Sequence, residues 1–106
     1  DSLSAWGFSI PYLIATKFEA FRGRGGGDWV ASHDVEDIVA LLDGAQTAFS
    51  ELRDATGLVR SYLEDQFREW TSRIDALEIV LGHVRPGPTS SPAATRIISA
   101  IRAFLA

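Results

Sequence analysis

Residues 46–83 read QTAFSELRDATGLVRSYLEDQFREWTSRIDALEIVLGH, and this stretch decides the fold class. Its apolar side chains recur at spacings of three and four residues, as they do along one face of an α-helix. Gly57 interrupts the pattern, so we expect the helical segment to break or kink there. The apolar positions are Phe49, Leu52, Leu58, Val59, Tyr62, Leu63, Phe67, Trp70, Ile74, Leu77 and Leu81.

Two shorter helices are expected before this stretch. The first covers about residues 11–22, because Pro11 suits a first helical turn and the glycines at 23 and 25–27 end the helix. The second follows Ser32, a good N-cap residue, and stops at Gly44. Residues 1–10 alternate loosely between polar and apolar side chains, which permits one short N-terminal strand.

The C-terminal part adds a last helix over about residues 93–106. It follows a loop at 85–92 that holds three of the four prolines. The sequence therefore predicts an all-α bundle of four to five helices. A chain of 106 residues fits a single domain spanning residues 1–106, or part of a larger one.

Composition excludes several functional classes. Ten basic against fourteen acidic residues give a net charge of −4, so a generic electrostatic grip on nucleic acid is not expected. The chain has no cysteine, which excludes disulfides, zinc–thiolate sites and thiol nucleophiles. No stretch approaches the roughly 20 apolar residues of a membrane span, so we expect no membrane partner. The chain also has no methionine, and we expect it to be part of a longer protein.

Lys17 interrupts the apolar pattern of the first helix. With successive residues about 100° apart, it falls near the centre of an apolar arc. A lysine there is costly unless its amine reaches solvent or meets an anion. Two interpretations stay open: a packed stem with the amine at an edge, or a lysine that binds an anionic ligand. The arc consists of Leu13, Ile14, Phe18, Ala20 and Phe21.

Asp34 and Asp37 border the apolar face of the second helix. One interpretation is a carboxylate site that orients a base, a metal or Lys17. The alternative is that Asp34 caps the helix and Asp37 pairs with an arginine. His33 and Asp37 lie at i and i+4, but two or three ligands on one turn are not a closed metal site. We therefore expect no metal bound by this chain's residues alone.

The loop between these helices is rich in glycine and arginine. Residues 22–28 read RGRGGGD, and backbone N–H groups with Arg22 and Arg24 suit phosphate binding. The GxxxxGK[ST] pattern of a P-loop is absent. An ordinary flexible connector is the alternative.

The same region resembles a known family. Residues 12–25 (YLIATKFEAFRGRG), Asp28 and residues 32–44 (SHDVEDIVALLDG) are similar to the second half of bacterial nucleotidyltransferase-like proteins related to the AbiEii-type abortive-infection toxins. That family carries an A-T-K-x-x-A helix, a short Gly/Arg loop and a D-x-x-D helix. The stretch from Gly82 through the final helix also looks like the end of these proteins.

The resemblance implies the helical C-terminal half of a cytoplasmic nucleotidyltransferase. Lys17 is then expected to contact the nucleoside triphosphate, and Asp34 or Asp37 to orient groups at the active site. The family holds Mg²⁺ with a D-x-D motif that is absent from this sequence. We therefore expect this chain alone to bind neither Mg²⁺ nor NTP and to be inactive, with the N-terminal nucleotidyltransferase half as its missing partner.

A different class of function is also open: a non-catalytic helical module for protein interaction or dimerisation. A small chain buries only a modest fraction of its surface, so a homodimer would add stability. A third interpretation, a helical protein that binds a small molecule, rests only on the aromatic residues.

Overall fold

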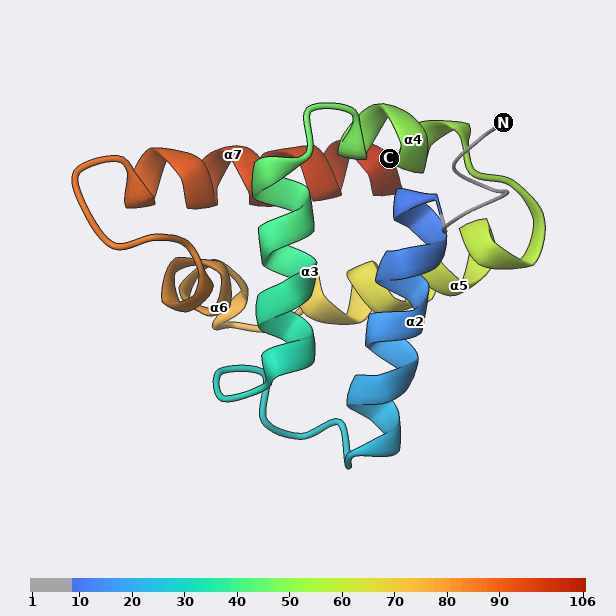
Figure 1. The fold of residues 1–106 in the computed structure, drawn as a ribbon, viewed down its shortest axis with the longest axis horizontal. Helices are drawn as coiled ribbons and strands as arrows, with labels where there is room; N and C mark the ends of the chain where they lie inside the picture. Colours follow the sequence, from blue (N-terminus) through green and yellow to red (C-terminus); the bar gives the residue numbers. More distant parts are fainter. Residues whose placement is uncertain (1–8) are drawn as a thin grey trace.

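The computed structural model describes residues 9–106, which form six α-helices and no strand (Figure 1). The all-α class is thus confirmed for this part of the chain, and the expected four to five helices are one or two too few. The expected N-terminal strand falls mainly on residues 1–8, outside the described residues. The helices are α2 (Ile10–Gly23), α3 (His33–Gly44), α4 (Ala48–Asp54), α5 (Gly57–Thr71), α6 (Ala76–His83) and α7 (Ser90–Leu105).

The additional helix comes from the stretch 46–83, which forms α4, α5 and α6. The break at Gly57 is confirmed: this residue has a φ of +66°, a left-handed conformation that favours glycine. A second break lies between Thr71 and Ala76, where neither glycine nor proline marks the sequence. Two side chains hold this turn. The Arg73 Nε donates to the Asp75 carboxylate at 2.8 Å, and the indole N–H of Trp70 donates to the Ala76 carbonyl at 3.3 Å.

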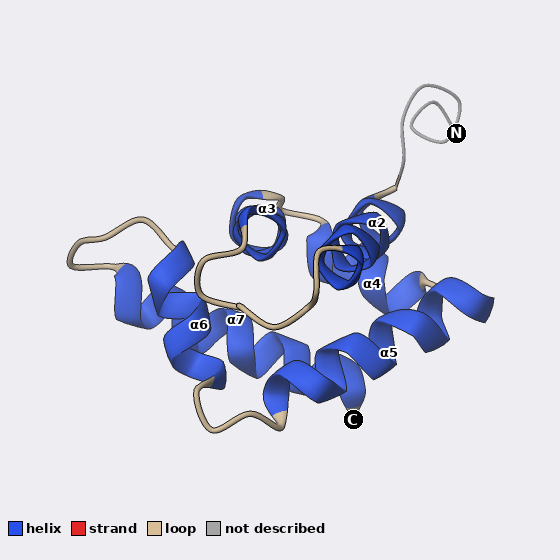
Figure 2. Cartoon of the chain, turned by 90° about the horizontal axis from the view of Figure 1, so that it is seen from below, coloured by secondary structure: helices blue, strands red, loops and turns tan. Residues whose placement is uncertain are grey.

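The helices are arranged in two layers. Helices α2 and α3 run antiparallel, side by side, and lie across a layer made of α5, α6 and α7 (Figures 1 and 2). Helix α4 connects α3 to this second layer and packs against α2 and α7. None of the helices in residues 9–106 combines the length and apolar character needed to cross a lipid bilayer.

An aromatic cluster joins the two layers. Phe18 of α2 meets Phe67 of α5 edge to face, with ring centroids 5.3 Å apart. Trp29, in the loop after α2, packs against Trp70 at 5.3 Å and is almost fully buried. The Nε2 atom of His83 lies 2.9 Å from the Trp29 carbonyl oxygen. These contacts hold the α2–α3 loop against the body of the protein.

Candidate functional site

Helices α2 and α3 bring four of the five predicted site residues together along one seam. The Nζ atom of Lys17 lies 2.8 Å from an Asp37 carboxylate oxygen. The Nη1 atom of Arg24 lies 2.5 Å from an Asp34 carboxylate oxygen. Lys17 comes from the middle of α2, Arg24 directly follows the end of α2, and the carboxylates come from the first turns of α3. We call these two ion pairs the α2–α3 seam.

Lys17 lies beside the buried face of α2 rather than at its centre. Its side chain is 38% exposed, and its amine reaches the surface at Asp37. Hydrogen bonding and charge attraction by Asp37 raise the pKa of Lys17 above its ordinary value. Of the two interpretations open for Asp37, the arginine partner is wrong, because Asp37 pairs with Lys17. The buried residues of α2 are Pro11, Ile14, Phe18 and Phe21.

Asp34 is the only charged residue that is buried among residues 9–106. It does not cap α3: the Ser32 hydroxyl does so, accepting the Val35 N–H at 3.1 Å. Burial of a carboxylate is costly unless a counter-charge compensates it. Arg24 supplies that charge, and the N-terminal turn of α3 adds the favourable end of the helix dipole.

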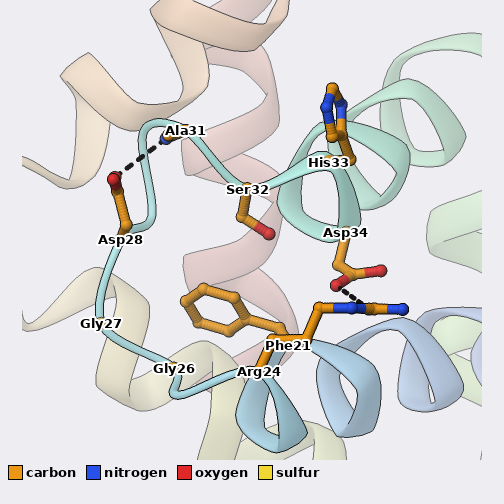
Figure 3. Close-up of a pocket in the computed structure, with 9 residues that line it drawn as sticks. All are labelled: Phe21, Arg24, Gly26, Gly27, Asp28, Ala31, Ser32, His33 and Asp34. Atoms are coloured by element: carbon orange, nitrogen blue, oxygen red, sulfur yellow. Dashed lines mark hydrogen bonds and ion pairs between the residues drawn. The ribbon is translucent and has the colours of Figure 1, made fainter.

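A hollow of about 400 Å³ opens beside the Arg24–Asp34 pair (Figure 3). Figure 3 shows the ring of Phe21 between the glycine-rich loop and Ser32. Cavities of this size accommodate small organic ligands. The lining residues are Phe21, Arg24, Gly26, Gly27, Asp28, Ala31, Ser32, His33 and Asp34.

The glycine-rich loop around this hollow follows a defined path. Gly25 and Gly26 have φ values of +105° and +64°, which turn the chain away from α2. The Gly26 N–H donates to the Phe21 carbonyl at 3.0 Å. The Asp28 carboxylate accepts the Ala31 N–H at 2.9 Å. The loop thus holds its shape through its own hydrogen bonds and leaves the backbone of Gly27 at the hollow.

Arg22, the fifth predicted site residue, lies away from the seam. Its Nε donates to Gln66 at 2.9 Å, and its Nη2 lies 3.0 Å from a Glu69 carboxylate oxygen. Its guanidinium also stacks on the rings of Phe21 and Trp29, with 5.4 Å to each centroid. Arg22 therefore joins α2 to α5 and does not line the hollow.

The residues described here do not form a metal centre. Within 9–106, no group of three or more His, Cys, Asp or Glu side chains is placed to hold a metal ion. The His33 side chain is 95% exposed, with its Nδ1 at 3.2 Å from Glu36. The carboxylates of Asp34 and Asp37 face cations instead. These residues therefore do not by themselves fit the Mg²⁺ that the family resemblance implies, and we derive no step through it.

Phe21, Asp28, Ser32 and His33 were not among the predicted site residues, although they line the hollow. The sequence feature that could have identified them is their position shortly before or after the glycines of this loop. No protein-family model, no curated protein sequence and no solved structure matches the chain. The nucleotidyltransferase-like relationship therefore depends on the sequence motifs quoted above and enters below as a proposal.

Proposed function

We propose that the α2–α3 seam and its hollow bind the phosphates of a nucleotide, as the helical half of a nucleotidyltransferase-like protein. One observation carries the proposal: Lys17, Arg24, Asp34 and Asp37 meet on one seam although up to 20 positions separate them in the chain. Three of these residues belong to the A-T-K-x-x-A and D-x-x-D motifs, and Arg24 belongs to the loop between them.

In this proposal Lys17 and Arg24 contact the phosphate oxygens. Ammonium and guanidinium groups are the usual partners of phosphate, through charge-assisted hydrogen bonds. The Arg24 side chain is 71% exposed, so a ligand can reach its guanidinium while Asp34 anchors it. The glycine backbone at 26 and 27 lets an anion approach the loop closely.

Asp34 and Asp37 act as positioning residues for these two cations. Asp34 holds the Arg24 guanidinium at the edge of the hollow, and Asp37 holds the Lys17 amine farther along the seam. Both cations are thus in place before a ligand arrives, which reduces the ordering cost of binding. The carboxylates that hold Mg²⁺ would come from the D-x-D half, outside this chain. The proposal therefore assigns nucleotide binding to this chain and transfer to the complete enzyme.

Calorimetric titration with ATP, GTP, CTP and UTP in the presence of Mg²⁺ tests this function. The missing D-x-D motif argued against NTP binding by this chain alone. Because Lys17 and Arg24 are already held at the seam, we now expect the parent chain to bind at least one of the nucleotides with a millimolar or tighter Kd. Lys17→Ala and Arg24→Ala should each weaken binding about tenfold, as loss of a charge-assisted hydrogen bond does. Arg102→Ala is the matched control, because Arg102 is an exposed residue in the last turn of α7. Failure of the parent to bind, or equal binding by Lys17→Ala, would contradict the proposal.

A non-catalytic interaction module is the second candidate. A specific observation favours it: an apolar groove lies on the other side of α2. The two functions use different surfaces and can coexist in one chain.

A further inference from the structure

The side of α2 that faces away from Lys17 forms one wall of an apolar groove. Tyr12, Ala15, Thr16 and Glu19 repeat with helical spacing along this wall. The opposite wall belongs to α5, which lies beside α2 in both ribbon views (Figures 1 and 2). It consists of Leu58, Val59 and Tyr62.

The groove continues toward the end of α4. Its first part is a hollow of about 300 Å³, and a second hollow of about 330 Å³ shares Tyr12 and Val59 with it. The second hollow extends along α4 past Glu51 to Asp54 and Thr56. We call the two hollows together the α2–α5 groove.

Two large apolar side chains of this groove are exposed to solvent. Leu58 is 89% exposed and Tyr12 is 44% exposed. An exposed leucine forfeits the free energy that its burial would supply. Apolar patches with a polar rim mark surfaces that bind another molecule.

The rim of the groove is acidic. Glu19, Glu51 and Asp54 line it, and no lysine or arginine among residues 9–106 does. Arg60, from the neighbouring turn of α5, points elsewhere: its guanidinium lies over the Phe104 ring, 4.3 Å from the centroid. The groove therefore presents an apolar floor between carboxylates.

We propose that the α2–α5 groove binds an amphipathic helical segment of a partner protein, with apolar anchors flanked by lysine or arginine. An apolar groove between two helices fits the apolar face of a third helix. The acidic rim supplies charge complementarity toward basic flanks. A second copy of this chain fits less well, because a symmetric groove-to-groove contact would bring Glu19 and Asp54 of both copies together.

A fluorescein-labelled amphipathic peptide with leucines on one face and lysines beside them tests this proposal by fluorescence anisotropy. We expect the parent to bind it and Leu58→Glu to weaken binding by about tenfold or more, since an apolar anchor is lost. Ile74→Glu is the matched control, because Ile74 is fully exposed on the turn after α5. Neither change touches the core, so both variants should keep the fold.

The charge of the rim is tested separately. The double variant Glu19→Gln with Asp54→Asn should bind the lysine peptide more weakly and with less dependence on salt. The same peptide with glutamate in place of lysine should bind the parent more weakly still. Lys17→Ala should bind the lysine peptide like the parent, which separates this proposal from nucleotide binding.

Several results would overturn the proposal. The first is that the parent does not bind the lysine peptide. The second is that Ile74→Glu loses as much peptide binding as Leu58→Glu does. The third is that the parent binds the glutamate peptide and the lysine peptide with equal affinity. Sedimentation gives a further criterion: a dimer of the parent that Leu58→Glu dissociates would assign the groove to a second copy of the chain.

Discussion

Lys17 fits the first of the two interpretations of its sequence position, a packed stem with its amine at an edge. Its stem lies beside the apolar face of α2, and its amine meets Asp37 at 2.8 Å. Helical spacing placed Lys17 on the apolar side, but which carboxylate it meets depends on how α3 lies beside α2. The same limit applies to Arg24 and Asp34. The sequence could therefore predict the members of the seam but not their pairing.

The single lysine also permits a direct test of the Lys17–Asp37 pair. NMR titration of its side chain should report a pKa above the ordinary value of 10.5, because Asp37 stabilises the ammonium form. Asp37→Asn should return this pKa toward the ordinary value, whereas Glu36→Gln on the exposed side of α3 should leave it unchanged. An unaltered lysine pKa in Asp37→Asn would refute the pairing.

The raised pKa of Lys17 also determines how the stability of the fold depends on pH. The folded chain holds this proton more tightly than the unfolded chain. The contribution of the Lys17 charge to the free energy of unfolding is therefore fully present below pH 10.5. It is lost as the pH rises through the pKa that Lys17 has in the folded chain. At neutral pH the seam keeps both of its cations.

At the scale of elements, periodicity and capping residues predicted most of the helices. The N-cap at Ser32, the end of α3 at Gly44 and the break at Gly57 are all as expected. The break between α5 and α6 was missed because an arginine–aspartate contact and an indole hydrogen bond hold that turn, without glycine or proline. Leu58 was counted with the apolar face, but the turn at Gly57 places it outside the core.

Alanine substitutions at two glycines test this description of the helices, because they should change the free energy of unfolding in opposite directions. Gly57→Ala should lower the free energy of unfolding by about 1–2 kcal/mol, because alanine is strained at positive φ. Gly82→Ala should raise it by roughly 0.5 kcal/mol, because an added Cβ in α6 meets nothing within 4 Å and alanine favours the helix. Urea denaturation measures both. A stabilised Gly57→Ala variant would rule out the described break.

At the scale of the whole molecule, helix α2 separates two surfaces of different character. On one side it forms the α2–α3 seam, where two cations meet two carboxylates beside a hollow. On the other side it forms the α2–α5 groove, which is apolar with an acidic rim. A nucleotide and a basic helical segment would therefore contact opposite sides of the same helix, and binding of one need not block the other.

The most direct test of the nucleotide-binding proposal is NMR chemical-shift mapping of the chain titrated with Mg·ATP. We expect the perturbed amides to gather at the seam and hollow, around Lys17, Gly26, Gly27 and His33, and to leave Leu58 unchanged. Perturbations that avoid this region, or no perturbation at millimolar nucleotide, would contradict the assignment of nucleotide binding to the α2–α3 seam.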